Sequence, residues 1–524
     1  MRYAVPALLA VSAIGCGLWP PARWALWVLV PLLIVAVWDF LQREHSLRRN
    51  YPLIARIRWL FEDLRPYLRA YIVESDREGR PFTIDERSLV YARAKGDIAT
   101  HPMGTELDVY SEEYEWLGHS IVPNEAAPET WHVRIGGDQC RKPYDSQLLN
   151  VSAMSFGSLS ANAIEALNKG AAMGGFAHDT GEGGISRYHR KHGGDLIWEL
   201  GSGYFGCRRK DGGFDAEQFA EAADDDQIRM IEIKLSQGAK PGHGGVLPGP
   251  KVTPEIAEAR RVTPWQDCLS PAAHSTFSTP IGLLQWVQQL RELSGGKPVG
   301  MKLCIGRRRE VMALMKAMIE TDITPDFIVV DGAEGGTGAA PQELTDNVGM
   351  PLREGLILMR NALVGTNLRH RVRLGASGKI HSGAGMARAY ALGADWCNAA
   401  RAFMFSLGCV QSMKCHTGQC PTGVATQIDW RQQGLVVEEK AERVARFHRE
   451  TLKALREIVV AMGLDSPWDL TYWDMFQRID GARAGPLDEV YQFLAPGQLI
   501  EAPETTDYAR AWASARAETF RAVA

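Results

Sequence analysis

The chain has 524 residues, 45% of them hydrophobic, and its 58 basic and 62 acidic residues leave a formal net charge of −4. That length and apolar content suffice for a large globular core. The balanced charge excludes the concentrated basic surface that nucleic-acid binding normally needs, so we expect no nucleic-acid partner. Nine cysteines are too sparse for a disulfide scaffold and three of them cluster, which favours a reducing compartment and a metal or cluster site.

Two apolar runs open the chain, at residues 3–19 and 24–38. A helix that spans a bilayer needs about 20 residues, so each run is short for this purpose. Tryptophans stand near the ends of both runs and arginines follow the second, which is typical of interfacial anchors and of a cytoplasmic flank. We predict a membrane hairpin over residues 1–42, with the catalytic body in the cytoplasm. The alternative is a cleaved export signal, because residues 13–16 weakly resemble a lipoprotein cleavage site.

The segment from residue 43 to 146 is charged, rich in arginine and tyrosine, and interrupted by prolines. This composition predicts a helix followed by loops and short strands, which form a connector that packs on the next domain. At the other end, residues 431–524 begin with an amphipathic pattern that runs to about Met462 and then becomes irregular. We therefore predict a helical C-terminal tail.

Between these segments, short apolar runs alternate with helical patterns, which is typical of repeated β-α units around a parallel sheet. Eight such units in about 250 residues predict an α/β fold of the (β/α)8 TIM-barrel type over residues 147–430, with a long insertion near 238–280. The expected strands are 148–154, 175–179, 196–200, 228–234, 299–303, 327–330, 372–375 and 396–399, and the expected helices are 161–173, 281–293, 308–320, 352–364 and 385–392.

The most specific motif is Cys409, Cys415 and Cys420, a C-x5-C-x4-C spacing that ends in Cys-Pro. Three thiolates can hold one iron-sulfur cluster, and the lack of a fourth cysteine indicates a cluster with a vacant corner or a non-cysteine ligand. Zinc with His416 is the alternative, although adjacent Cys415 and His416 cannot easily bind the same ion. The six other cysteines are interpreted as small buried apolar residues.

Residues 409–427, CVQSMKCHTGQCPTGVATQ, resemble the cluster-binding segment of glutamate synthases. Three further segments match the synthase domain of that family in the same order. They are MSFGSLS at 154–160 with HDTGEGG at 178–184, KLSQGAKPGHGGVLPGPK at 234–251, and GGTGAAP at 335–341. The resemblance implies a stand-alone FMN-binding synthase barrel with a [3Fe-4S] cluster and no glutaminase domain. One departure is His243, where glutamate synthases tend to carry an acidic residue.

The predicted FMN site has a ring end and a phosphate end. Met154, Ser155 and Gly157 follow a strand, and small or soft side chains there let a flavin ring approach the backbone. Glycine-rich loops after two late strands offer backbone N–H groups to a phosphate, and a guanidinium follows the last strand. The residues concerned are Gly335, Gly336, Thr337, Gly378 and Arg401. Each glycine run taken alone could be a simple turn, and none has the G-x-G-x-x-G form of a dinucleotide fold.

A glycine- and proline-rich loop after the strand at 228–234 carries the predicted substrate-binding residues Lys234, Gln237, Lys240 and Lys251. Several cations at the catalytic face of a barrel suit a dicarboxylate, and the resemblance implies 2-oxoglutarate, with Lys234 and Gln237 near the flavin. A solvated basic loop is the alternative.

Two further residues are predicted to be catalytic. Lys302, inside a strand, could stabilise the reduced flavin, or could simply pair with a carboxylate. Glu182 is a polar partner or proton donor at the ring, or it orients a loop. His178, His189 and His192 are interpreted as loop polar groups and not as a metal site.

The reaction that the resemblance implies is reductive amination of 2-oxoglutarate to L-glutamate, with ammonia either free or supplied by a partner. The electron donor is external, such as ferredoxin or an NAD(P)H reductase. Two alternatives remain open: a membrane-associated FMN and iron-sulfur electron-transfer oxidoreductase that acts on another small acid, and a barrel that has lost its chemistry and serves in an assembly.

Overall fold

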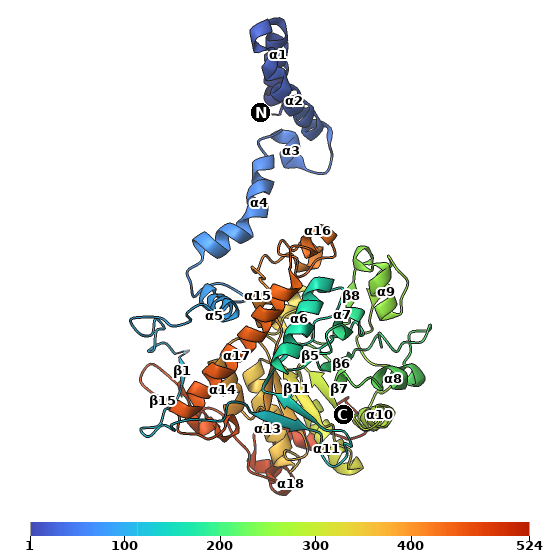
Figure 1. The fold of residues 1–524 in the computed structure, drawn as a ribbon, viewed down its shortest axis with the longest axis vertical. Helices are drawn as coiled ribbons and strands as arrows, with labels where there is room; N and C mark the ends of the chain where they lie inside the picture. Colours follow the sequence, from blue (N-terminus) through green and yellow to red (C-terminus); the bar gives the residue numbers. More distant parts are fainter. Residues whose placement is uncertain (1, 113, 523–524) are drawn as a thin grey trace. The chain divides into compact units, whose positions relative to one another are not determined.

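The computed structural model describes residues 2–112 and 114–522. The chain divides into two compact units, Met1–Asp85 and Glu86–Ala524 (Figure 1). The smaller unit is helical and the larger one contains all the strands.

The first unit consists of helices, two of which are strongly apolar. By length and composition, the continuous helical stretch Pro20–Leu41 could cross a membrane, whereas the apolar helix Ala4–Leu18 is shorter. These two segments cover the two apolar runs of the sequence, and α1 packs against α2. The elements are α1 (Ala4–Leu18), η1 (Pro20–Ala25), α2 (Leu26–Leu41), α3 (Ser46–Asn50), α4 (Arg56–Leu68) and η2 (Arg69–Val73).

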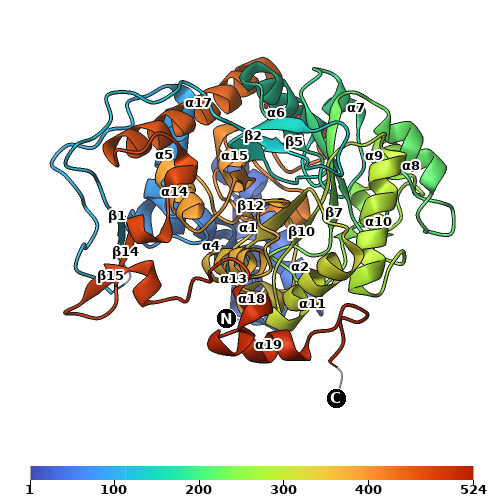
Figure 2. The same ribbon diagram turned by 90° about the horizontal axis from the view of Figure 1, so that it is seen from below.

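The second unit is built on a closed parallel barrel, which confirms the predicted fold class. Every predicted strand is present, and the strands follow one another round the barrel in chain order. Figure 2 shows helices arranged around these strands. The strands are β4 (Leu149–Val151), β5 (His178–Asp179), β6 (Leu196–Leu200), β7 (Ile228–Lys234), β10 (Val299–Leu303), β11 (Phe327–Asp331), β12 (Arg373–Ser377) and β13 (Trp396–Ala399).

The five predicted helices are also present, and three of them begin where a side chain satisfies a free backbone N–H. Ser160, Thr279 and Ser382 accept hydrogen bonds at the starts of three of them, as N-cap residues do. The helices of the barrel are α6 (Ala161–Gly174), α7 (Arg187–Arg190), α8 (Ala216–Ala223), α10 (Pro280–Leu293), α11 (Arg308–Thr321), α12 (Gln342–Asn347), α13 (Leu352–Gly365), α14 (Gly383–Ala391) and α15 (Arg401–Ser406).

An antiparallel hairpin closes the end of the barrel at which the strands begin. It consists of β2 (His132–Ile135) and β3 (Tyr144–Gln147). Val133 and Ile135 of the hairpin pack in one buried cluster with side chains from the starts of four strands. The cluster members on the strands are Ile197, Met230, Phe327, Val329 and Trp396, and Ala177 just before β5 also belongs to the cluster. The opposite end, where the strands finish, is left for the functional site.

Two glycines make room for the aromatic rings of this cluster. A Cβ atom on Gly300 would lie 2.4 Å from the ring of Phe327, and one on Gly375 would lie 2.6 Å from Trp396. We expect Gly300→Ala to lower the free energy of unfolding by about 1–3 kcal/mol, because the core is overpacked. Thermal unfolding measures this loss. The control is Gly481→Ala, since an added Cβ meets nothing there; equal stability of the two variants would contradict the prediction.

The remaining elements surround the barrel. The long insertion holds β8 (Val246–Leu247), η3 (Gly249–Lys251), α9 (Pro254–Arg260) and β9 (Cys268–Leu269). Helix α17 (Val437–Ala461) packs on α6 and α14, so the helical part of the predicted C-terminal tail is confirmed. Beyond it the description as helical is wrong, because β14 (Met475–Arg478) and β15 (Ala484–Pro486) form a sheet with β1 (Glu115–Leu117). The other helices are α5 (Ile84–Lys95), α16 (Asp429–Gln432), α18 (Gln498–Glu501) and α19 (Ala509–Ser514).

Candidate active site

A small pocket lies where the central barrel strands end. Glu182 follows β5, Lys234 ends β7, and the loop after β7 folds over them with Gln237 and His243. The nitrogen Nζ of Lys234 lies 3.0 Å from Oε1 of Glu182, so these two predicted residues form an ion pair. The pocket is lined by Glu182, Ser202, Lys234, Leu235, Ser236, Gln237, Gly242, His243, Gly244, Gly245, Pro271 and Ala272.

Glu182 is surrounded by positive charge. Burial alone would raise the pKa of its carboxyl group, but Lys234, and then Lys240 and Arg260, outweigh burial and lower the pKa to about 2. Lys240 is itself buried, which lowers the pKa of its ammonium group, and its Nζ donates to the carbonyl of Gly244 at 3.4 Å. At neutral pH Glu182 is therefore a carboxylate anion, which makes it an acceptor in this site and not a proton donor.

Arg260 is a site residue that sequence reasoning missed. It ends α9 in the insertion, is 4% exposed, and donates from Nη2 to Oγ of Ser155 and to the carbonyl of Phe156, both at 3.2 Å. Its Nε atom has no partner among the described residues. Arg260 thus connects the loop after β4, predicted to hold the flavin, with the charges around Glu182.

Lys251 departs from the prediction. Its Nζ donates to the backbone carbonyl of Cys415 at 2.8 Å, and its pKa is lowered by burial. The turn of η3 at Gly249–Lys251 carries this lysine to the cysteine segment and away from the pocket that holds Lys234 and Gln237. Lys251 therefore lies at the cysteine segment, whereas Arg260 is one of the cations around Glu182.

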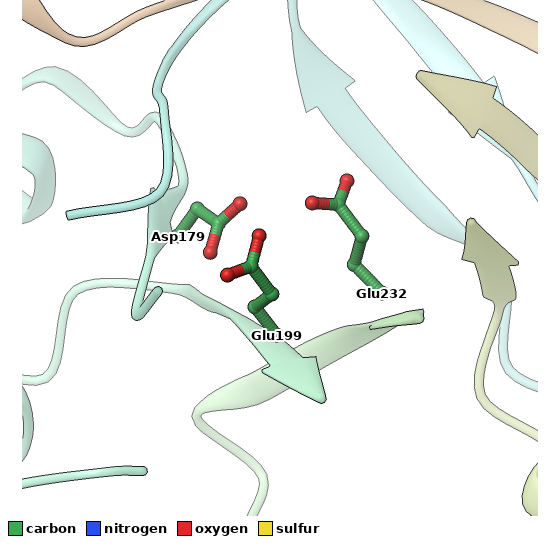
Figure 3. A group of neighbouring side chains, drawn as sticks. All are labelled: Asp179, Glu199 and Glu232. Atoms are coloured by element: carbon green, nitrogen blue, oxygen red, sulfur yellow. The ribbon is translucent and has the colours of Figure 1, made fainter. Parts of the chain in front are cut away.

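Below the pocket, three carboxylates and one lysine lie inside the barrel. Side chains two residues apart on a strand point to the same side, so Glu199 and Glu232 face inward like Ile197 and Met230 of the core cluster. Glu199 and Glu232 are also partners in the β6–β7 register. Figure 3 shows them with Asp179 of β5; one oxygen from each of the three lies within 4.8 Å of the others.

Lys302 of β10 supplies the cation of this cluster. Its Nζ contacts a carboxylate oxygen of Glu199 and lies 3.2 Å from Oε1 of Glu232. Three carboxylates of this kind could suggest a metal site, but the ammonium group already occupies the position of the cation. The structure therefore supports the carboxylate-paired interpretation of Lys302.

Because one ammonium group cannot neutralise three buried carboxylates, the cluster retains protons. Burial, with Glu199 nearby, outweighs the attraction of Lys302 and raises the pKa of Glu232 to about 7. Burial also raises the pKa of Asp179. Oε1 of Glu232 faces the ammonium group of Lys302, whereas Oδ2 of Asp179 and Oε2 of Glu232 have no hydrogen-bond partner among the described residues.

This cluster predicts an unusual dependence of stability on pH. In the folded state the pKa of Glu232 is about 7, whereas the pKa of an ordinary glutamate is 4.5. Between these two pH values, unfolding therefore releases the Glu232 proton. The free energy of unfolding should therefore fall as pH rises from about 4.5 to 7, by on the order of 1–3 kcal/mol, and level off above. Chemical denaturation at several pH values measures it. Glu232→Gln should lose this decline; an unchanged slope in that variant would refute the assignment.

The residues predicted for the flavin ring lie beside the pocket. Met154 and Ser155 are buried, and Gly157 has a φ of 101°, which favours glycine. A Cβ atom on Gly181, just before Glu182, would lie 2.6 Å from the backbone nitrogen of Ser155. The loops after β4 and β5 are thus packed backbone to backbone.

The residues predicted for the phosphate also gather at this end of the barrel. Nη2 of Arg401 donates to the carbonyl of Glu334 at 2.5 Å, and a Cβ on Gly336 would lie 2.8 Å from Nε of Arg401. Burial lowers the pKa of Arg401 to about 10. Gly335 and the exposed Thr337 lie on either side of Gly336 in the same loop. Gly378 in the next loop has a φ of 152°.

The three cysteines of the motif are free thiols in one loop segment after α15. Burial raises the pKa of Cys409 to about 12 and also raises the pKa of Cys415. The pKa of Cys409 is raised further by Cys415 and Cys420, and that of Cys415 by Cys420. Cys420 is 4% exposed. The segment thus carries three free thiols in one loop, with Cys420 buried and Cys409 and Cys415 partly buried.

The cysteine segment contacts both neighbouring loops. Nε2 of Gln427 donates to the carbonyls of Gly157 and Leu159 at 3.2 and 3.0 Å, and Lys251 reaches Cys415 as described. The segment therefore packs against the loop after β4.

Two of the three histidines were interpreted incorrectly. His178 and His189 are fully buried, His178 on β5 and His189 in α7, and burial lowers the pKa of both rings. They are core groups and not loop groups. His192 forms a hydrogen bond with Glu165, with Nε2 and Oε1 2.9 Å apart.

Comparison with known proteins gives a family match over most of the larger unit. A family model described as a conserved region in glutamate synthase matches residues 127–465. The chain is 35% identical to the glutamate synthase large subunit-like protein YerD of Bacillus subtilis (strain 168), an alignment that covers 89% of this chain and 97% of that protein.

Other relatives match over a smaller share of their length. The archaeal-type glutamate synthase (NADPH) of Thermotoga neapolitana is 34% identical over 60% of this chain and 59% of its own. The glutamate synthase (NADPH) large chain of Azospirillum brasilense is 34% identical over 60% of this chain and 20% of its own. This chain thus spans about three fifths of the first and one fifth of the second.

Solved structures with a related fold include a lactate oxidase of Pediococcus acidilactici. It is 13% identical with a TM-score of 0.44, over 76% of this chain and 95% of that one. A mandelate oxidase is 15% identical with a TM-score of 0.40, over 78% and 97%. These likenesses concern the fold alone.

Proposed function

The chain belongs to the glutamate synthase family, and on this basis we propose that its barrel is an FMN-dependent oxidoreductase that makes L-glutamate from 2-oxoglutarate and ammonia. The observation that carries the proposal is the group of three cations, Lys234, Lys240 and Arg260, around Glu182 at the carboxyl end of the barrel. Two positive charges in excess fit a substrate with two carboxylates.

The residues present fit FMN. The glycine contacts at Gly181 and Gly336 leave no room for side chains where a ring and a phosphate approach the backbone. The unpartnered oxygens of Asp179 and Glu232 lie beneath, where N–H groups of a flavin could satisfy them. Met154, Ser155 and Gly157 would hold the ring, and Gly335, Gly336, Thr337, Gly378 and Arg401 the phosphate. When bound, FMN would supply the hydride.

The chain's own groups would bind and orient the substrate. Lys240 and Arg260 pair with its carboxylates, while Lys234 remains bridged to Glu182. Because the low pKa of about 2 keeps Glu182 ionised, its oxygens accept hydrogen bonds from the protonated nitrogen that is added to the substrate. The loop 235–245 covers the pocket and limits access of water.

A [3Fe-4S] cluster is part of the proposal, with Cys409, Cys415 and Cys420 as its ligands. The fit rests on three clustered thiols together with two cations, Lys251 at Cys415 and the buried Arg87 near Cys409, which would balance a negatively charged cluster. Since the segment packs against the loop of Gly157, electrons from an external donor would reach the flavin here.

The first test is anaerobic purification followed by flavin and iron analysis, electron paramagnetic resonance, and assay with 2-oxoglutarate, ammonium and a reduced donor. A three-iron signal and glutamate formation are expected. FMN and cluster without a response to 2-oxoglutarate would favour the alternative, an electron-transfer oxidoreductase that acts on another small acid. One observation points that way, since His243 lines the pocket where an acidic residue was expected.

The substrate pocket makes a separate prediction. Lys240→Gln should raise KM for 2-oxoglutarate by about 10- to 100-fold with a smaller change in kcat, because a charge-assisted hydrogen bond of the bound substrate is lost. Steady-state kinetics with saturating ammonium measures it. Lys210→Gln is the control for removal of a lysine charge, since Lys210 is exposed and is not among the cations around Glu182, whereas Lys240 is. An unchanged KM for Lys240→Gln would exclude this lysine from substrate binding.

We further propose that the first unit anchors the protein in a membrane with the catalytic body in the cytoplasm. The support is the apolar stretch Pro20–Leu41, long enough to span a bilayer, paired with the apolar α1 and followed by arginines. The test is cell fractionation with alkaline carbonate washing. Release of the full chain into the supernatant would reject the anchor.

A further inference from the structure

Helix α4 (Arg56–Leu68) carries an apolar face that is open to solvent. Ile57, Leu60, Phe61 and Leu64 are 53%, 57%, 58% and 42% exposed. Their spacing of three and four residues places them on one side of the helix, and Leu68 continues the stripe one turn later. An uncovered apolar stripe of this length calls for an apolar partner.

Charged side chains flank the stripe. At 100° per residue, Arg58 and Arg65 border one edge, whereas Glu62 lies on the side away from the stripe and pairs with Arg58 at 2.8 Å. Trp59 also lies on that side, where the guanidinium of Arg48 is 4.2 Å from its ring centre. An apolar face with arginines at its border is typical of helices that lie in the headgroup region of a bilayer.

An ion pair ties the start of α4 to the end of α2. Asp39, in the last turn of α2, is fully buried and accepts from Nε and Nη2 of Arg56 at 2.9 and 2.7 Å. Its Oδ2 also accepts from the backbone N–H of Leu53 at 3.1 Å. The start of α4 is therefore held close to the end of α2, where α2 would leave a bilayer.

We propose that α4 lies in the membrane–water interface, with its apolar face among the acyl chains and Arg58 and Arg65 on anionic phospholipid headgroups. This inference rests on the anchor proposed above. The partner is the bilayer surface, because the ion pair fixes α4 beside the spanning segment and because each basic residue near an anionic surface strengthens binding by about fivefold.

The test uses the full chain reconstituted in vesicles of phosphatidylcholine with phosphatidylglycerol. A diazirine-bearing residue is placed singly at Phe61, at Glu62 or at Val28 of α2, and lipid adducts are measured by mass spectrometry after illumination. Phe61 should give several-fold more lipid adduct than Glu62, its neighbour on the opposite side. Equal adducts at Phe61 and Glu62, or adducts of Phe61 with the chain itself, would overturn the proposal.

Val28 separates this proposal from the anchor. Adducts at Val28 without adducts at Phe61 leave the anchor intact and reject the interfacial helix, whereas a lack of adducts at both positions rejects both.

A second arm of the experiment tests the role of the arginine charges. The double variant Arg58→Gln/Arg65→Gln, or vesicles of phosphatidylcholine alone, should lower the Phe61 adduct several-fold; an unchanged yield in both would overturn the assignment to anionic headgroups.

Discussion

Replacing Lys302 by methionine is expected to remove several kcal/mol of stability, the largest loss from any single change in the barrel interior. Removing one partner of a buried ion pair costs about 3–5 kcal/mol, because the other charges remain buried without compensation. Here the remaining groups are Glu199, Glu232 and Asp179. Urea denaturation of the purified variant measures the effect, and poor expression of soluble protein is expected alongside it.

A compensated variant distinguishes the two roles considered for Lys302. In Lys302→Met/Glu199→Gln/Glu232→Gln three of the four ionisable groups are replaced together, and Asp179, whose pKa is raised by burial, is the one that stays. Because Asp179 can keep its proton, stability should largely return. If this variant folds, binds FMN and turns over normally, Lys302 has only a structural role. If it folds but its flavin reduction potential shifts and kcat falls, the ammonium group also acts on the flavin. Wild-type stability in the single variant would contradict the charge argument itself.

Replacing Cys420 by serine is expected to abolish electron delivery by the external donor. The loss of one of three thiolate ligands should lower the iron content and remove the three-iron signal. Turnover with the protein donor should fall by at least about a hundredfold, whereas reoxidation of chemically reduced flavin by 2-oxoglutarate and ammonium should persist. Iron analysis with both assays on one preparation makes the measurement.

Cys140→Ser is the control, because Cys140 is also a free thiol, although it is partly exposed where Cys420 is buried, and it packs beside Gly296, away from the cysteine segment. It should retain its iron. Full iron content in Cys420→Ser would show that this cysteine is not a ligand. Equal loss in the two assays would instead indicate that the segment supports the flavin loop and does not conduct electrons.

The barrel was predictable because most of its strands are short, nearly continuous apolar runs; β5 (His178–Asp179) is an exception. Strand boundaries moved by only a few residues, as for 148–154, which became β4 (Leu149–Val151). The carboxylate cluster was harder to foresee. Glu199 and Glu232 each interrupt an apolar strand, which is a visible signal, but only the β6–β7 register shows that they face each other.

The substrate loop illustrates where sequence spacing fails. Lys234 and Lys240 were assigned to one site and lie in it, whereas Lys251, in the same loop, contacts the cysteine segment. Arg260 takes the place of Lys251 although nothing in the pattern distinguishes it from Arg261 beside it. Which side chain of an irregular insertion turns inward depends on how the loop folds back, and local periodicity carries no such information.

The hairpin β2–β3 limits the faces from which other molecules can reach the functional site. By filling the amino-terminal mouth of the barrel with Val133 and Ile135, it leaves a single open face, which the substrate loop and the cysteine segment already share. Under the proposed function, small molecules and an electron-donating protein approach the barrel from this same face. We therefore expect that donor docking and substrate exchange exclude each other in time, so that a saturating concentration of donor protein slows product release.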